Sequence, residues 1–215
     1  MEENSDKKSW INQHLATIII GFFTLITGLY TIYTTSNQSS KDKMTDYKIE
    51  QMKLNNDEMI NANNRQIAVI YSELYDLRNK LDVDRVFIIQ AHPEHRNLYL
   101  SVSFEVDKKG VSMIKDIFQN IPISEMPKFA KTLSTTNWLH FNDINNQLDD
   151  NRMKSLMWMA GTTDIVIIQL VNAQNNWIGS LVAENIHGKK IDDGAVIETM
   201  KTTANAIQFI LPPIN

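Results

Sequence analysis

The sequence of 215 residues predicts an α+β fold, an antiparallel sheet with flanking helices, preceded by an N-terminal transmembrane helix and a helical stalk. Three observations predict it: an apolar stretch without charges near the N-terminus, a following segment without Pro or Gly, and a later order of helix, two strands, helical middle, hairpin and helix. We therefore divide the chain into a tail (1–14), a transmembrane helix (15–35), a stalk (36–66) and a globular domain (67–215).

Composition excludes several classes of protein. The net charge is −4, from 21 basic and 25 acidic side chains. This balance argues against a nucleic-acid partner, which requires a concentrated basic surface. The chain has no cysteine, which excludes disulfides, thiolate chemistry and Cys-ligated zinc.

The predicted transmembrane helix lies within residues 9–40, which contain no Asp, Glu, Lys or Arg. Its apolar part approaches the ~20 residues that cross a bilayer. Trp10, Tyr30 and Tyr33 lie near its ends, where aromatic rings favour the membrane interface. A cleaved signal peptide is the alternative, but no small-residue cleavage site follows. We therefore expect the segment to stay in the lipid bilayer.

The small and polar residues of this span recur at alternating spacings of three and four, which places them on one helix face. This predicted association face consists of His14, Thr17, Gly21, Thr24, Gly28, Thr31 and Thr35. Small residues let transmembrane helices approach closely, and Thr hydroxyls bond between them. The face therefore predicts a homo-oligomer, although Thr27 and Thr34 lie off it and chance spacing is the alternative.

The membrane orientation follows from the flanking lysines. Lys7 and Lys8 precede the span, and Lys41, Lys43 and Lys48 are among the lysines that follow it. Counting basic residues slightly favours a cytoplasmic C-terminal domain.

The stalk begins after a polar break at residues 36–40, and residues 41–81 are predicted to be helical. A register of three and four connects Ile60, Ile67, Ile70, Leu74, Leu77 and Leu81. About two good heptads are fewer than a sustained coiled coil needs. The second half of this helix is therefore either a coiled coil or, the interpretation we favour, the first helix of the globular domain.

The globular domain is predicted from short patterns. Residues 84–90 and 99–106 form strands, the second with Leu100, Val102, Phe104 and Val106 on one face. Helices are expected near 125–133 and over 143–159. Residues 164–171 and 177–184 form a hairpin across 172–176. Asp192 is expected to cap a last helix that ends before Pro212.

Candidate chemical sites are few. His92 and His95 have a metal-ligand spacing, but a polar surface loop is the favoured interpretation because three ligands are usually needed. His140 and His187 lie beside polar turns without a recognisable partner. The cluster Met153, Met157 and Met159 is interpreted as core. No catalytic or phosphate-binding motif is present. We expect no enzyme activity, no cofactor and no metal.

Several segments carry a family resemblance. Leu77-Arg78, Asp84-Arg85-Val86-Phe87-Ile88, Ala91-His92 and Leu100-Ser101-Val102-Ser103-Phe104-Glu105-Val106 resemble the opening strands of GAF-like domains. Gly110-Val111-Ser112, Phe118-Gln119-Asn120-Ile121-Pro122-Ile123-Ser124 and Trp177-Ile178-Gly179-Ser180-Leu181 resemble a subset found in tailed-phage membrane proteins. The resemblance covers about residues 67–211 and implies a GAF/PAS-like sheet. Pro93-Glu94 replaces the Asn-Gly that often follows the family's histidine.

The overall layout resembles the T-even phage holin family. That resemblance implies oligomers in the host inner membrane that permit timed lysis, with a periplasmic domain regulated by an antiholin-like protein. The alternatives are a membrane-tethered GAF-like sensor of small molecules and a phage membrane protein with only a binding role.

Overall fold

The computed structural model describes residues 3–93, 96–186, 188–191 and 193–214. Within the long N-terminal helix, side chains are described at residues 20, 22–34 and 48–81. The chain forms two compact units, residues 1–60 and 61–215. Because the units are not placed relative to one another, each is considered by itself.

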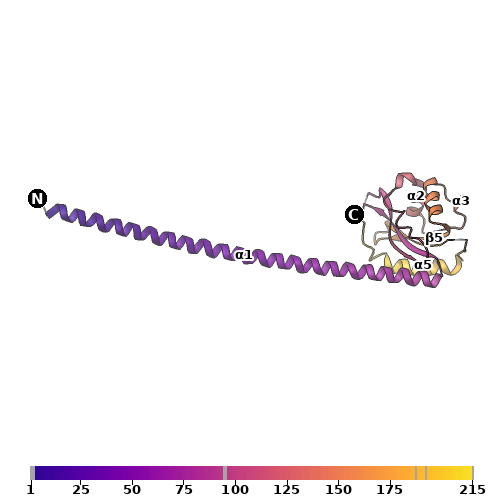
Figure 1. The fold of residues 1–215 in the computed structure, drawn as a ribbon, viewed down its shortest axis with the longest axis horizontal. Coiled ribbons are helices and arrows are strands. Elements are labelled where there is room, and N and C mark those ends of the chain that lie inside the picture. Colours follow the sequence, from indigo (N-terminus) through magenta and orange to yellow (C-terminus); the bar gives the residue numbers. More distant parts are fainter. Residues whose placement is uncertain (1–2, 94–95, 187, 192, 215) are drawn as a thin grey trace. The chain divides into compact units, whose positions relative to one another are not determined.

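Helix α1 runs from Glu3 to Leu81 without interruption (Figure 1). The predicted polar break at residues 36–40 is therefore wrong. This segment consists of Ser, Asn and Gln, of which Gln is a good helix former and Ser and Asn are moderate ones. Since none of them removes a backbone donor as Pro does, the helix continues through the segment. No helix within the described residues is long and apolar enough to cross a bilayer.

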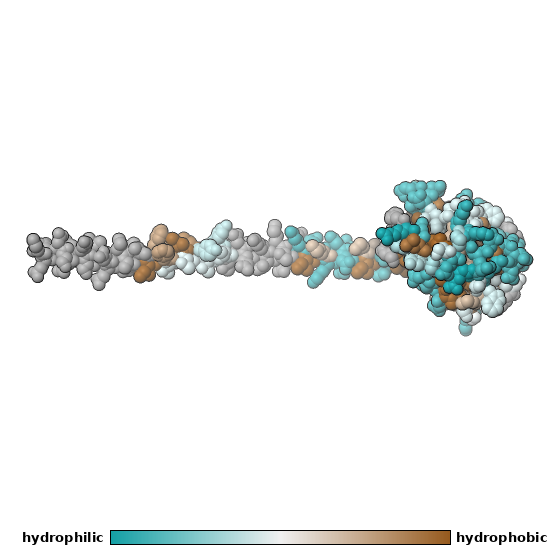
Figure 2. Space-filling view, turned by 90° about the horizontal axis from the view of Figure 1, so that it is seen from above, coloured by the Kyte–Doolittle hydropathy of each residue, from teal (hydrophilic) through white to brown (hydrophobic). Residues whose placement is uncertain are grey.

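The described part of α1 carries many exposed apolar side chains, seen as brown residues along the helix in Figure 2. In the first unit they include Ile20, Phe22, Phe23, Leu25, Ile26, Leu29 and Ile32. The surface of the globular unit in the same view is mainly hydrophilic, with scattered hydrophobic side chains.

The globular unit contains one antiparallel sheet, which has six strands within the described residues, in the order β3-β2-β1-β6-β5-β4. The strands are β1 (Arg85–His92), β2 (Tyr99–Asp107), β3 (Ile121–Pro122), β4 (Trp138–Phe141), β5 (Thr162–Val171) and β6 (Trp177–Ile186). The predicted strand pair and hairpin are confirmed as β1–β2 and β5–β6. The short outer strands β3 and β4 were not predicted from the sequence.

The remaining helices are η1 (Ile123–Glu125), α2 (Pro127–Thr135), α3 (Ile144–Gln147), α4 (Asn151–Met159) and α5 (Asp193–Ile207). The single helix predicted over 143–159 is wrong, because the chain is extended at Leu148. Leu148 is buried in the core, and Asp150 Oδ2 accepts a hydrogen bond from Phe129 N at 2.5 Å. These two contacts hold the chain away from a helical path. The predicted cap Asp192 lies outside the described residues.

Two apolar cores cover the two faces of the sheet. The first joins Phe87, Ile89 and Val182 to buried side chains of α2, α3 and α4. The second joins Val86, Ile88 and Leu181 to α1 and α5, which lie side by side in Figure 1. From α1 and α5 it takes Ile70, Leu74, Leu77, Val196, Met200, Ala204 and Ile207, all buried. The C-terminal part of α1 is therefore the first helix of the globular domain.

A β-bulge corrects the predicted face of β2. Leu100 and Val102 lie in the first core, whereas Phe104 and Val106 contact the second core on the opposite face. The register between β1 and β2 shifts between Ile88 and Ile89, so β2 carries one extra residue there. An extra residue reverses the alternation of side chains, because strand periodicity is two.

Candidate functional site

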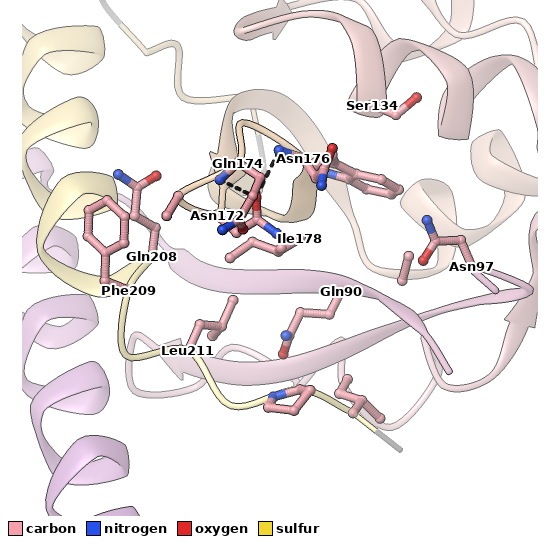
Figure 3. Close-up of a pocket in the computed structure, with 15 residues that line it drawn as sticks. Gln90, Asn97, Ser134, Asn172, Gln174, Asn176, Ile178, Gln208, Phe209 and Leu211 are labelled. Carbon is pink, nitrogen blue, oxygen red and sulfur yellow. Dashed lines mark hydrogen bonds between the residues drawn. The ribbon is translucent and has the colours of Figure 1, made fainter. Parts of the chain in front are cut away.

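A cavity of about 640 Å³ lies at the end of the sheet, where β1 ends and the β5–β6 hairpin turns (Figure 3). The segment that follows α5 forms another wall. Cavities of this size hold small molecules. Six carboxamide side chains line it: Gln90, Asn97, Asn172, Gln174, Asn176 and Gln208.

The rest of the lining is apolar or weakly polar. Trp177, Ile178, Phe209 and Leu211 contribute aromatic and aliphatic surface, and Ser134 contributes a hydroxyl. Of the described residues that line the cavity, none is charged. An ionised ligand would therefore lose hydration without gaining a counter-charge, so the lining favours an uncharged ligand.

Gln90 has a buried side-chain oxygen without a hydrogen-bond partner among the described residues. Its side chain is buried, with 4% exposure. Its Nε2 donates to the carbonyl oxygen of Pro212 at 3.1 Å, which orients the carboxamide. Its Oε1 has no hydrogen-bond partner among the described residues. A buried acceptor left unpaired costs about 1–3 kcal/mol. Because this oxygen is closed off from the cavity, the carboxamide must turn before the oxygen can accept from a ligand N–H or O–H group.

Gly179 on β6 makes room for the Gln90 side chain. A Cβ atom at Gly179 would lie 2.7 Å from the Ile89 carbonyl oxygen and 3.1 Å from Gln90 Cγ. Both distances are shorter than ordinary van der Waals contact. A side chain at this position would displace Gln90 or the backbone of β1, so the wall of the cavity depends on this glycine.

The hairpin wall is held by its own hydrogen bonds. Asn172 Oδ1 accepts from the backbone N–H groups of Gln174 at 3.0 Å and Asn176 at 2.9 Å, drawn as dashed lines in Figure 3. Asn175 has a φ of 61°, a left-handed conformation that asparagine tolerates better than most residues. The side chains of Gln174 and Asn176 are exposed and contribute to the wall.

The cavity is in contact with the core beside α1. Ile178 and Leu211 line the cavity and also pack against the second core, which contains Leu74 of α1. Gln208 Oε1 accepts from Val171 N at 3.3 Å and so connects the end of α5 to the end of β5. A ligand that moves the segment after α5 would therefore change contacts that reach α1.

A second polar cluster lies at the opposite end of β1, around the buried guanidinium of Arg85. This side chain is 1% exposed and faces three carboxylates. Arg85 Nη1 donates to Glu184, while Arg85 Nε lies 3.2 Å from Asp107 Oδ1 and 3.4 Å from Glu105 Oε1. Arg85 Nη2 donates to the Ser112 carbonyl at 2.7 Å. One guanidinium therefore faces three carboxylates in a site that is nearly closed to solvent.

Burial, together with the excess of acids, raises two pKa values. Burial, followed by repulsion from Glu105, raises the pKa of Asp107 to about 7, against the attraction of Arg85. Burial also raises the pKa of Glu184 to about 7, although Arg85 and Thr162 stabilise its ionised form. The two oxygens of Glu105 accept from the backbone N–H groups of Ile114 at 2.6 Å and Lys115 at 2.7 Å.

These raised pKa values predict that the domain is more stable in mild acid. An acid whose pKa is higher in the folded than in the unfolded chain stabilises the fold while protonated. We expect the free energy of unfolding to fall from about pH 4.5 to pH 7, by on the order of 1 kcal/mol per pH unit for Glu184. Urea unfolding of the full-length chain at several pH values would measure this slope.

Glu184→Gln should flatten that pH dependence, because the amide does not titrate. Glu125→Gln is the matched control, since the Glu125 side chain is 48% exposed and pairs only with Arg152 at 3.2 Å. An unchanged slope in Glu184→Gln would show that Glu184 is ionised throughout this range.

The association face predicted from the sequence is described only in part. Thr24, Gly28 and Thr31 belong to exposed turns of α1, and Thr24 Oγ1 donates to the Ile20 carbonyl at 2.8 Å. Thr31 Oγ1 likewise donates to the Thr27 carbonyl at 2.8 Å. The side chains of His14, Thr17, Gly21 and Thr35 lie outside the described residues. Self-association through this face stays a prediction.

The histidines differ from their predicted settings. His92 lies on β1 rather than on a surface loop, and its Nε2 is 2.8 Å from Ser101 Oγ. Burial lowers the pKa of His92. His140 has a partner, since its Nε2 lies 2.6 Å from the buried Asp164 Oδ1. His95 and His187 lie outside the described residues.

Two further sequence predictions concern metals and the methionine cluster. Among the described residues, no cluster of His, Asp and Glu could hold a metal ion. Met153 and Met157 are buried in the first core, whereas Met159 is 57% exposed. The interpretation of these methionines as core is thus right for two of the three.

Comparison with known proteins identifies the fold. No family model and no curated protein match the chain. Among solved structures, GAF3 of Slr1393 from Synechocystis is 14% identical, with 66% of this chain and 90% of that chain covered and a TM-score of 0.55. The globular domain has a GAF-like fold. The blue-light-absorbing form of the PixJ GAF domain of Thermosynechococcus elongatus has a similar fold. It is 13% identical, with 67% of this chain and 86% of that chain covered and a TM-score of 0.56.

The GAF-like fold confirms that part of the sequence resemblance. A phycocyanobilin-bound GAF domain from a cyanobacterial phytochrome is 16% identical, with 69% of this chain and 90% of that chain covered and a TM-score of 0.53. At these identities the likeness shows the fold alone. The resemblance to tailed-phage membrane proteins and T-even holins gains no support from the comparisons.

Proposed function

We propose that the GAF-like domain is a sensor module that binds a small uncharged molecule in the cavity beside Gln90. The observation that carries this proposal is a cavity lined by carboxamides, beside which Gln90 Oε1 is buried without a partner among the described residues. Solved structures of similar fold include a GAF domain bound to phycocyanobilin, which supports a ligand-binding role for this fold. The described residues that line the cavity offer no convergent catalytic groups, so the cavity is suited to binding rather than chemistry.

The proposed signal leaves the domain through α1. A bound molecule would contact Phe209 and Leu211 directly after α5, and Leu211 packs against the core that holds α5 and α1 together. Ile70, Leu74 and Leu77 of α1 are fully buried in that core. A change at the cavity therefore has a continuous packed route to the helix.

We also propose that the N-terminal part of α1 tethers the domain to a membrane. Support comes from residues 9–40, which contain no charged side chain, and from the exposed Phe22, Phe23 and Leu29. Expressed full-length protein should sediment with membranes and resist a salt wash. Recovery in the supernatant would contradict the tether but not the ligand site.

Thermal unfolding of the full-length protein tests the sensor proposal. Probe panels of saccharides, nucleosides and N-acyl amides, each with a charged counterpart, are added to wild-type protein and to Gln90→Leu. We expect at least one uncharged panel to raise the wild-type unfolding temperature by several degrees, since each kcal/mol of binding is worth about 2–4 °C in a domain of this size. The charged counterparts should have no effect.

Gln66→Leu is the matched control, because Gln66 is an exposed residue of α1 outside the cavity. It should respond to the probes as the wild type does, whereas Gln90→Leu should not. If no panel stabilises the wild type, or if Gln90→Leu is stabilised equally, the cavity is not a ligand site.

A further inference from the structure

The polar groups of the cavity surround its space instead of lying along one edge. In Figure 3, Gln208 and Asn97 lie at opposite sides, with Gln90 and the Asn172 hairpin between them. They come from the end of α5, the β1–β2 loop, β1 and the β5–β6 connection. The Gln208 carboxamide and Asn172 Oδ1 already have partners within the chain. A ligand that satisfies the remaining groups, on β1, the β1–β2 loop and the hairpin turn, must carry hydrogen-bonding groups on more than one side.

The carboxamides define what these groups are. Each amide offers both donors and an acceptor, so it pairs best with a group that also does both, such as a hydroxyl. Asn97, Gln174 and Asn176 have side chains without a hydrogen bond to another described residue, and Gln90 Oε1 adds a buried acceptor. The site thus suits a ligand with many hydroxyl or acetamido groups.

Two other classes of small molecule fit less well. A phosphorylated or carboxylated ligand would have no counter-charge among the described lining residues. A nucleobase places its hydrogen-bonding groups in one plane and along one edge, which would leave amides on the other sides of the cavity unused. A pyranose ring carries hydroxyls around its rim and an apolar C–H face that can lie on an aromatic ring such as Trp177 or Phe209.

We infer that the cavity takes an uncharged saccharide, and that the Gln90 carboxamide turns on binding so that its Oε1 accepts from a sugar O–H or N–H group. This inference rests on the proposed sensor function and names the ligand class of the same site. Trp177 is suited to contact the sugar ring because its indole N–H is already used, at 3.2 Å from Ser180 Oγ, and its side chain lines the cavity.

Titration calorimetry with the full-length protein tests the ligand class. The probes are N,N′-diacetylchitobiose, cellobiose, adenosine and glucose 6-phosphate. We expect a disaccharide to bind and the other two probes not to bind. Gln90→Leu should weaken disaccharide binding by about ten-fold or more, as expected for loss of one buried hydrogen bond. Gln66→Leu should bind as the wild type does.

A second variant keeps the test valid if Gln90→Leu does not fold. Asn176→Ala changes an exposed side chain and should also weaken disaccharide binding. Disaccharide binding that neither variant weakens would overturn the site. Binding of adenosine without either disaccharide would overturn the saccharide inference and leave the sensor proposal standing. Binding of none of the four probes would also overturn the saccharide inference. The sensor proposal is overturned as well only if all the broader probe panels fail to stabilise the wild-type protein.

Discussion

Arg85→Met is expected to lower the free energy of unfolding by about 3–5 kcal/mol, the usual cost of removing one partner of a buried ion pair. Arg85 and Glu184 are 1% and 0% exposed, and the guanidinium is the cation that both Glu184 and Asp107 contact. Methionine fills a similar volume, so the loss would come from uncompensated carboxylates rather than from a cavity. Urea unfolding of the full-length chain measures it.

The pH dependence of this loss separates electrostatics from packing. At about pH 5 Asp107 and Glu184, whose pKa values are raised to about 7, are protonated even with Arg85 in place, so its removal leaves fewer uncompensated charges and the loss should be smaller than at pH 8. Arg152→Met is the matched control, since that side chain is 44% exposed and forms a surface pair with Glu125. It should cost less than about 1 kcal/mol. A loss in Arg85→Met that is equal at both pH values would contradict the electrostatic account.

Leu74→Ala is expected to lower the free energy of unfolding of the globular domain by about 2–5 kcal/mol. Leu74 is fully buried in the core that α1 shares with α5 and the sheet. The substitution removes apolar contacts and leaves a cavity that the packed elements around it close only in part. The expected loss follows if this part of α1 is a core helix rather than a free stalk.

The same substitution at Leu54 provides the control, because Leu54 lies on α1 with 52% of its surface exposed. Leu54→Ala should change the free energy of unfolding by less than about 0.5 kcal/mol. Equal effects of the two substitutions would mean that Leu74 contributes no more to the domain than an exposed leucine. Leu74→Ala should also weaken any response of α1 to a ligand in the cavity.

The candidate site could not be predicted from sequence patterns, although some of its residues are unusual for their positions. Arg85, Glu105 and Glu184 are charged residues within strongly apolar strands, and a charge in a buried strand indicates a partner. The identity of that partner depends on strand pairing, which sets Arg85 opposite Asp107 on one side and Glu184 on the other. The carboxamides of the cavity carried no such signal, because Asn and Gln are common in turns.

The face of β2 shows the same limit at the scale of one residue. Alternation alone placed Leu100 and Phe104 together, and it is correct on each side of the bulge. The extra residue at the bulge is visible only in the register with β1. The missed break in the helix prediction near Leu148 likewise reflects a contact with a distant residue, Phe129.

Periodicity and turn composition, which depend only on neighbouring residues, were therefore sufficient to predict the strands β1 and β2, the β5–β6 hairpin and the last helix. The Arg85 cluster, the cavity beside Gln90 and the burial of Leu74 arise when segments far apart in the chain pack together. Arg85 and Glu184 meet only because β1 pairs with β6. Local patterns carry no information on such pairs, so they become visible only in the folded domain.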